Sequence, residues 1–217
     1  MQQRPTAADY RRRRAIAGVI VIGVVALVVI GGAMAFGGGG GSDAAAPTTT
    51  TAPPTTAPTT TLVPPRVTAI GDSVMLGAAQ ALIQAIGPER TTVDAQESRQ
   101  FSAGVDVIQG YKDRGELGDE VVVQLGTNGT VNPSDFDRMM QILKGVRKVL
   151  ILNAKVPRPW EDEVNETLAD GVKRYKNAVL VDWHTIGDAH PEYFYGDGLH
   201  LRPAGQQAYA QLVLANL

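Results

Sequence analysis

Residues 67–76 read VTAIGDSVML, a stretch that predicts a buried strand turning directly into a helix. Its first four residues form a short apolar run rich in β-branched side chains, and Gly71 permits a sharp turn before the helical pattern VMLGAAQALIQAI. Ser73 therefore lies at a helix N-terminus, where unpaired backbone N–H groups and the helix dipole favour negative charge. This environment suits a serine nucleophile, but an N-cap role for Asp72 or Ser73 explains the same residues.

Four segments of contrasting composition make up the 217 residues. Residues 1–14 are polar and basic, residues 15–36 carry no charge, residues 37–65 are rich in Gly, Thr and Pro, and residues 66–217 have the mixed composition of a globular domain. At about 1.5 Å per residue, the uncharged segment reaches about 33 Å, which matches a hydrocarbon core of roughly 30 Å. We expect this segment to be a single membrane-spanning helix.

The arginines at residues 11–14 place the N-terminus in the cytoplasm and the large domain outside the cell membrane. A cleaved signal peptide is the competing interpretation, because Ala33-Met34-Ala35 fits the cleavage pattern, although the apolar core exceeds the usual length of about 7 to 15 residues. Cleavage would make the protein secreted. Either outcome exports the domain, and the absence of cysteine fits an exported protein that does not rely on disulfides.

The composition of residues 37–65 cannot bury a core, so we expect a disordered linker. Its Thr/Pro part favours extended polyproline II, and roughly thirty such residues reach on the order of 90 Å. This length suits a domain held away from the membrane, within reach of a cell wall, although a passive spacer has the same composition. Residues 66–217 contain 15 Lys and Arg against 20 Asp and Glu, a net charge of −5, and show no basic patch, so we expect no nucleic-acid partner.

From residue 66 onward, short apolar runs alternate with amphipathic helical patterns, which predicts an α/β domain with a parallel sheet covered by helices on both faces. The predicted strands are residues 67–70, 91–95, 120–125, 147–152 and 178–182. The predicted helices are residues 74–86, 102–111, 133–145, 160–175 and 202–216. Ligands bind such sheets beyond the carboxyl ends of the strands, so the residues that follow each strand are the candidates for a site.

Three predicted loops offer groups that can face Ser73. After the second strand, the candidates for a backbone N–H donor are Ser98, Arg99, Gln100 and Gly104, and Arg99 is also either a substrate contact or an ordinary surface residue. After the third strand, Asn128 lies between two glycines, where its amide suits a developing oxyanion and also suits a plain tight turn. After the fourth strand, Arg158 and Trp160 offer a cation and a flat apolar face for a sugar, unless Trp160 only packs the loop onto the domain.

The segment 184–202 contains all three histidines of the chain and is predicted to be one long irregular loop, a feature often linked to function. Asp197 and His200 are three residues apart in it. A turn there lets the carboxylate meet one imidazole nitrogen while the other faces outward, as a general base requires. His184 and His190 lack a comparable placement and are interpreted as loop histidines.

Three sequence blocks, GDSVM from Gly71, GTNG from Gly126 and DGLHL from Asp197, occur in the order found in the SGNH/GDSL hydrolase superfamily. The domain resembles this superfamily from about Val67 to Leu217. More narrowly, it resembles the extracytoplasmic SGNH domains of membrane acyltransferases that O-acetylate peptidoglycan and other envelope glycans, and SRQ, VPRPWEDEVN and VDW are also similar to that group. The resemblance implies a flavodoxin-like three-layer α/β/α fold.

The resemblance also implies a triad in which Ser73 is the nucleophile, His200 the general base and Asp197 its orienting carboxylate. Asn128 and backbone N–H groups, including that of Ser73, then form the oxyanion hole. One departure concerns Ser98, which stands where the family usually supplies a glycine. The backbone N–H of Ser98 can still donate to the oxyanion, and Gly104 is the alternative donor. The sequence shows no convincing ligand cluster, so we expect neither a metal nor another cofactor.

The predicted function is that of a membrane-anchored serine esterase, which removes O-acyl groups, acetyl in the simplest case, from envelope glycans through an acyl-enzyme. An O-acyltransferase with the same triad is the alternative. Family members that transfer acetyl carry a many-helix donor domain, so transfer by this chain would need a separate multi-span membrane partner. A glycan-binding module without chemistry is the third interpretation, and the complete set of Ser73, Asn128, Asp197 and His200 argues against it.

Overall fold

A computed structural model of the chain describes residues 64–217. The predicted basic tail, membrane helix and nearly all of the predicted linker lie outside the described residues, so residues 1–14, 15–36 and 37–63 keep only their sequence-based expectations. Within residues 64–217, no helix is both long enough and apolar enough to cross a membrane.

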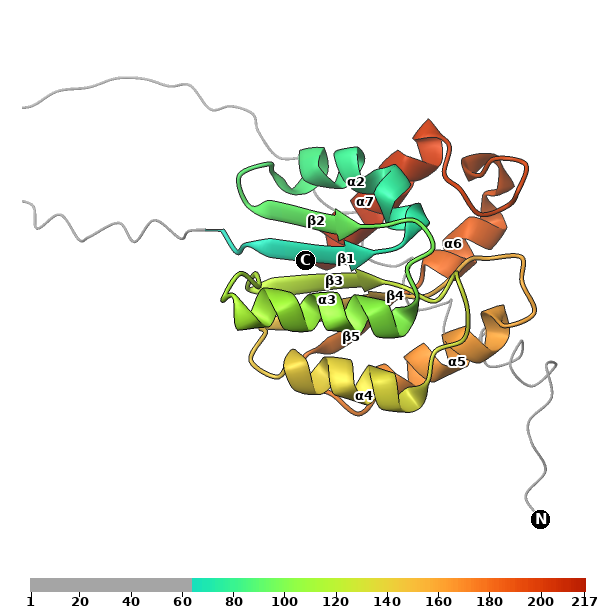
Figure 1. The fold of residues 1–217 in the computed structure, drawn as a ribbon. Coiled ribbons are helices and arrows are strands. Elements are labelled where there is room, and N and C mark those ends of the chain that lie inside the picture. Colours follow the sequence, from blue (N-terminus) through green and yellow to red (C-terminus); the bar gives the residue numbers. More distant parts are fainter. Residues whose placement is uncertain (1–63) are drawn as a thin grey trace, which may run out of the picture. The chain divides into compact units, whose positions relative to one another are not determined.

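Five short strands form one parallel sheet in the order β2-β1-β3-β4-β5 (Figure 1). This is the flavodoxin-like order, in which ligands bind where the strand order reverses, at the carboxyl ends of β1 and β3. Both strands are buried over their whole length, as expected when helices cover both faces of a parallel sheet. The strands are β1 (Val67–Gly71), β2 (Thr91–Ala95), β3 (Glu120–Gln124), β4 (Lys148–Leu152) and β5 (Ala178–Val181).

Helices cover the sheet on both faces (Figure 1). The first face is covered mainly by α2 and α7, and the second by α3, α4 and α5. Side chains of successive strand residues point to opposite faces, so Val122 belongs to the first core and Val121 and Val123 to the second. The helices are α2 (Ser73–Ile86), α3 (Phe101–Asp113), α4 (Pro133–Ile142), α5 (Glu161–Val172), α6 (Trp183–Ala189) and α7 (Pro203–Asn216), with a 3₁₀ turn, η1, at Pro191–Tyr193.

The predicted parallel sheet and its five flanking helices are confirmed, with strand ends within one residue and helix ends within three. The prediction of one irregular loop over residues 184–202 is wrong, because α6 and η1 lie in it. Asp182 caps α6: its Oδ1 accepts the Thr185 N–H at 3.0 Å and its Oδ2 accepts the Thr185 hydroxyl at 2.6 Å. Trp183 is 1% exposed and packs edge-on against Tyr209 of α7, with 5.2 Å between ring centroids. Capping and burial thus stabilise a helix of only seven residues.

Candidate active site

The nucleophile candidate, Ser73, is the first residue of α2 and is separated from β1 by Asp72 alone. Asp72 is fully buried, and its Oδ1 accepts the Val74 N–H at 3.0 Å. Its Oδ2 accepts the Thr127 hydroxyl at 2.7 Å, which joins the β1–α2 turn to the turn after β3. Asp72 therefore takes the N-cap role, and the Ser73 side chain is left for other contacts.

Burial raises the pKa of Asp72 to about 6, because a carboxylate removed from water is disfavoured. Weaker effects lower the pKa of Asp72 but do not outweigh burial: the hydrogen bonds from Thr127 and Val74 and the charge of the nearby His200 ring. The turn that carries Ser73 therefore contains a buried carboxyl group that changes its charge in the mildly acidic range.

The loop before α7 brings His200 to Ser73. His200 Nε2 lies 3.1 Å from Ser73 Oγ, and His200 Nδ1 lies 2.7 Å from Asp197 Oδ2. An ionised Asp197 only accepts hydrogen bonds, so Nδ1 carries the proton of a neutral imidazole and Nε2 accepts from the Ser73 hydroxyl. The side chains of His200 and Asp197 are each 48% exposed, so this arrangement is open to solvent.

Asp197 is held in place by its own loop. Its Oδ1 accepts the backbone N–H groups of Leu199, at 2.9 Å, and His200, at 3.0 Å. The side-chain hydrogen bond with His200, assisted by these two N–H groups, lowers the pKa of Asp197 to about 2 against a weaker effect of partial burial. The carboxylate is therefore ionised at neutral pH and can orient the imidazole.

Asn128 and Ser98 lie beyond the carboxyl ends of β3 and β2, on either side of β1. The Asn128 amide nitrogen lies 3.2 Å from Thr127 Oγ1 and 3.4 Å from the Arg99 carbonyl oxygen. Gln100 Nε2 donates to the Asn128 carbonyl at 2.6 Å, so the two loops are joined. Ser98 is exposed with a left-handed φ of 58°, and its N–H has no acceptor within residues 64–217.

The structure does not leave Gly104 or Arg99 free for the predicted roles. Gly104 lies inside α3, where its N–H donates to the Gln100 carbonyl at 3.0 Å and is not available to an oxyanion. Arg99 is 8% exposed, and its guanidinium donates to Asp94 at 2.6 Å and to the Gly71 carbonyl at 3.1 Å. Arg99 therefore supports the turn before Ser73 from inside the protein and does not face a substrate.

The loop between β4 and α5 separates the two residues predicted to form a sugar-binding wall. Arg158 is exposed, and its guanidinium has no hydrogen-bond partner or carboxylate contact among the described residues. Trp160 is half-buried and packs against the second core, with its indole nitrogen buried. The structure therefore agrees with the alternative interpretation, in which Trp160 packs the loop onto the domain.

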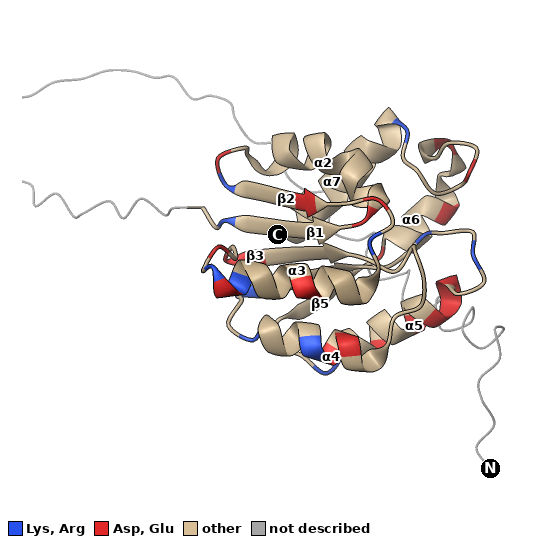
Figure 2. Cartoon of the chain, in the orientation of Figure 1, with Lys and Arg blue, Asp and Glu red and all other residues tan. Residues whose placement is uncertain are grey.

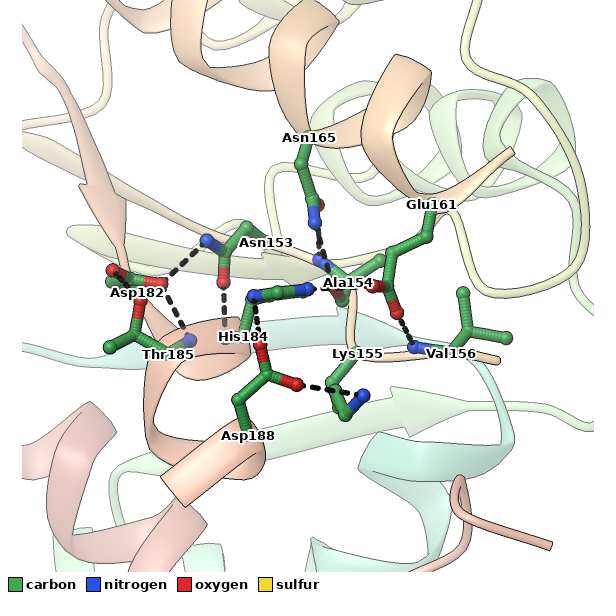
Figure 3. A network of polar contacts seen from close by, with 10 residues as sticks. All are labelled: Asn153, Ala154, Lys155, Val156, Glu161, Asn165, Asp182, His184, Thr185 and Asp188. Atoms are coloured by element: carbon green, nitrogen blue, oxygen red, sulfur yellow. Dashed lines mark hydrogen bonds and ion pairs between the residues drawn. The ribbon is translucent and has the colours of Figure 1, made fainter. Parts of the chain in front are cut away.

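His184 lies in α6 at the centre of a buried polar network (Figure 3) and is not a loop histidine. Its Nε2 lies 2.6 Å from Glu161 Oε1, and its backbone N–H donates to Asn153 Oδ1 at 2.7 Å. Its Nδ1 lies 3.3 Å from Asp188 Oδ2, without hydrogen-bond geometry. Asp188 in turn pairs with Lys155 at 2.9 Å. These contacts tie the β4–α5 loop to α6.

Two further residues of the site region were not singled out from the sequence. Thr127, which binds Asp72, lies in the GTNG block, and its position beside Asn128 is a signal that could have identified it. Nothing in the sequence pairs Glu161 with His184.

The third histidine, His190, is partly exposed, as expected of a loop histidine, and lies 2.8 Å from a carboxylate oxygen of Glu192. Within residues 64–217, no cluster of three or more His, Cys, Asp or Glu side chains is arranged to hold a metal ion.

The sheet order and the Ser–His–Asp arrangement at its carboxyl edge define an α/β protein of the serine-hydrolase type. No protein-family model matches the chain. YrhL of Bacillus subtilis, named provisionally as a peptidoglycan O-acetyltransferase, is 37% identical over 148 residues, which are 68% of this chain and 23% of that protein. Peptidoglycan O-acetyltransferase OatA of Listeria monocytogenes is 34% identical over 150 residues, with the same coverage.

Among solved structures, the C-terminal catalytic domain of Streptococcus pneumoniae peptidoglycan O-acetyltransferase A superposes with a TM-score of 0.57 at 23% identity, covering 69% of this chain and 90% of that one. A family 3 carbohydrate esterase of Clostridium thermocellum superposes with a TM-score of 0.55 at 15% identity, covering 70% and 94%. The chain belongs to the SGNH/GDSL hydrolase superfamily, as its sequence blocks predicted. It spans about a quarter of the length of the curated relatives it matches.

Proposed function

We propose that the domain is a serine esterase that removes O-acyl groups, acetyl in the simplest case, from cell-envelope glycans. The observation that carries the proposal is the hydrogen-bonded chain from Ser73 through His200 to Asp197, with contacts of 3.1 and 2.7 Å. The relatives named peptidoglycan O-acetyltransferases support an acyl group on a glycan as the substrate. The exposure of His200 supports a substituent on a polymer, since an open site admits a long chain.

In the proposed mechanism, His200 Nε2 takes the hydroxyl proton of Ser73 while Oγ attacks the ester carbonyl. The tetrahedral intermediate collapses, the sugar oxygen leaves with the proton that His200 returns, and an acyl-serine forms. Water then attacks this acyl group and gives a proton to His200. When the second tetrahedral intermediate collapses, His200 returns that proton to Ser73 Oγ, the carboxylic acid is released and Ser73 is regenerated. Asp197 stays ionised throughout and stabilises the imidazolium that forms twice in the cycle.

The proposed oxyanion hole combines three groups from three loops. The Ser73 N–H lies at the N-terminus of α2, where it adds to the positive end of the helix dipole. The N–H of Ser98, which has no acceptor within residues 64–217, and the side-chain amide of Asn128 are the other proposed donors. The Asn128 amide would exchange one of its long contacts, 3.2 Å to Thr127 Oγ1 or 3.4 Å to the Arg99 carbonyl, for the oxyanion. Removing one such donor typically lowers kcat by about 10²- to 10³-fold. We expect the kcat of Asn128→Ala to decrease by a factor in that range.

The test uses the full-length chain with a small acetyl ester, beside Ser73→Ala and His200→Ala. We expect each variant to lose about 10⁴-fold or more in kcat, because the members of a triad act as a unit. The kcat/KM of the native protein should rise with pH, since only a neutral imidazole accepts a proton. Unchanged hydrolysis in both variants would reject the triad.

Acyl transfer is the second candidate, because the relatives at 34 to 37% identity are named O-acetyltransferases. The acyl-serine would then pass its acyl group to a sugar hydroxyl in place of water, with His200 taking the hydroxyl proton. We propose that a multi-span membrane partner would supply the acyl donor. The ratio of acylated sugar to free acid, measured with an added glycan acceptor, separates the two candidates.

We further propose that residues 15–36 anchor the protein in the cell membrane and that residues 37–65 carry the domain toward the wall. The uncharged length of the first segment and the Gly/Thr/Pro composition of the second support this arrangement. The test is fractionation of cells that express the chain, followed by protease treatment of intact spheroplasts. Recovery of the full-length chain from the cytosol would reject the anchor.

A further inference from the structure

The loop that carries His200 folds back on itself as a short two-stranded bridge, Phe194 opposite Leu201. The Tyr195 N–H donates to the His200 carbonyl at 2.9 Å, and the Arg202 N–H donates to the Tyr193 carbonyl at 2.8 Å. Phe194 and Leu201 are 5% and 2% exposed, so their side chains define the buried face of the bridge. Side chains alternate along extended backbone, and Tyr195, His200 and Arg202 therefore share the opposite, exposed face.

Large apolar side chains flank the Ser73–His200 pair on two elements. Tyr195 is 50% exposed and Leu76 is 43% exposed, and only one other large hydrophobic side chain within residues 64–217 is comparably open. Leu76 follows Ser73 by three residues in α2, so both lie on the same side of the helix. A flat aromatic ring beside an open reaction centre suits the apolar face of a sugar ring.

Arg202 is held over Tyr195, and no carboxylate of residues 64–217 pairs with its charge. Its Cζ lies 5.2 Å from the centre of the Tyr195 ring, and its Nε donates to the Phe194 carbonyl at 2.8 Å. No carboxylate of the described residues lies within 4.0 Å of this guanidinium, whereas five other arginines are paired in this way: Arg99, Arg114, Arg138, Arg147 and Arg174. The terminal N–H groups of Arg202 therefore remain available, in the planar geometry that matches a carboxylate.

We infer that Tyr195 and Arg202 form a binding subsite for a sugar that carries a carboxylate, next to the residue whose ester Ser73 attacks. The inference rests on the proposed function and names a substrate class for that site. The sugar ring lies on the part of the Tyr195 ring that the Arg202 guanidinium leaves exposed, and its carboxylate binds that guanidinium. The described domain has a net charge of −5, and its charged residues are scattered over the elements (Figure 2), so a local cation is needed to hold an anionic glycan.

The test measures binding to the full-length chain carrying Ser73→Ala, which prevents turnover. The probes are two oligosaccharides of one sequence, one with a free carboxylate on a sugar and one with that carboxylate methyl-esterified. We expect the charged probe to bind about twofold to fivefold more tightly, the range for an exposed ion pair, and Arg202→Gln to remove this preference. Tyr195→Ala should bind both probes more weakly, whereas Tyr195→Phe, which keeps the aromatic ring, should bind them as tightly as the unchanged tyrosine does.

The matched control is Arg90→Gln. Arg90 also donates its Nε to one backbone carbonyl, that of Ile86 at 2.8 Å, and has no carboxylate within 4.0 Å among residues 64–217, but it precedes β2 at the opposite end of the sheet. Equal affinity for the two probes, no affinity for either, or the same result for Arg202→Gln and Arg90→Gln would overturn the inference. Because the assay needs no turnover, it can fail while ester hydrolysis by the native chain succeeds, and the reverse is also possible.

Discussion

At the scale of single residues, two carboxyl groups near Ser73 have opposite electrostatic properties. Burial raises the pKa of Asp72 to about 6, whereas hydrogen bonds with His200 and the backbone lower the pKa of exposed Asp197 to about 2. Environments that separate the pKa values of neighbouring carboxyl groups allow them different roles. Asp197 is suited to a permanent negative charge beside the imidazole, and Asp72 to holding the turn.

Asp72→Asn should change how stability depends on pH. In the unfolded chain Asp72 ionises near pH 3.8, but in the folded protein it keeps its proton up to about pH 6. The folded state thus binds more protons between these values, so the contribution of Asp72 to stability falls as the pH rises through this window and stays low above it. Asparagine retains the acceptor for the Val74 N–H, and its amide nitrogen can donate to Thr127 Oγ1 in place of accepting from it, without the charge. We expect the variant to gain up to about 3 kcal/mol over the native chain at pH 8, measured by urea unfolding.

The same comparison at pH 4 supplies the control, because Asp72 is then largely protonated in the folded protein. The advantage of the variant should be much smaller there. If the free energies of unfolding of the variant and the native chain differ by the same amount at pH 4 and pH 8, burial does not govern the protonation of Asp72.

Asp197→Asn should impair catalysis more than folding. An asparagine does not impose the Nδ1–H tautomer on His200, so Nε2 no longer reliably accepts the Ser73 proton, and kcat should fall by roughly 10⁴-fold. The matched control is Asp170→Asn, which removes the carboxylate of another exposed pair with three-residue spacing, Asp170–Lys173 at 2.7 Å. Hydrolysis rates and thermal unfolding of both variants give the measurement. An equal kcat in the two variants would contradict the role of Asp197.

At the scale of elements, contacts of α5 with α6 support the β4–α5 loop, which lies beside the turn that carries Asp197. Glu161, at the start of α5, accepts the backbone N–H of Val156 as well as contacting His184 (Figure 3). Burial alone would raise the pKa of Glu161, but these contacts outweigh burial and lower it, so the carboxylate is charged. The neighbouring Pro157 lies 3.6 Å from the position of a β-carbon on Gly198, directly beside Asp197.

Glu161→Gln should loosen this support. The substitution keeps the shape but removes the charge that faces His184 and Lys155, and we expect a loss of about 1 to 3 kcal/mol in the free energy of unfolding. Glu163→Gln is the matched control, because Glu163 is exposed in the same helical turn. Urea unfolding and amide hydrogen exchange of residues 153–160 are the measurements. If both variants behave alike, the network does not stabilise the loop.

The elements were predictable from the sequence where local signals agree. β1 and β3 are apolar runs that end in glycine-containing turns, and parallel strands bring such turns to one edge, so the placement of Ser73 and Asn128 at that edge followed from topology. The approach of His200 to Ser73 was expected from the family's sequence blocks. The short helix α6 was missed because its cap, Asp182, and its buried Trp183 read as the end of a strand. Burial of Arg99 could not be predicted either, since its acceptors, Asp94 and the Gly71 carbonyl, depend on how β2 and β1 pair.

At the scale of the whole molecule, the described residues contain both hydrophobic cores and the Ser73–His200–Asp197 contacts of the proposed site. Two hydrophobic cores lie on the two faces of the sheet, and both are built from residues within 67–217. The hydrogen bonds that Asp197 and His200 make with each other, with Ser73 and with the Leu199 and His200 N–H groups also lie within this range. Residues 64–217 should therefore fold and react without the segments that precede them.

This independence can be tested by comparing residues 64–217 with the full-length chain in detergent. Because both cores and the Ser73–His200 contact are formed by residues within 67–217, we expect the same thermal unfolding midpoint and a kcat/KM for a small soluble ester that agrees within about twofold. In cells, the full-length chain should remove more acyl groups from the insoluble wall than residues 64–217 do. Only the full-length chain has the predicted anchor and linker that hold it at the envelope. A shorter chain that aggregates or unfolds at a clearly lower temperature would mean that the preceding residues contribute to the fold. If both chains instead release acyl groups from the wall equally well in cells, residues 15–65 are not needed to hold the domain at the envelope.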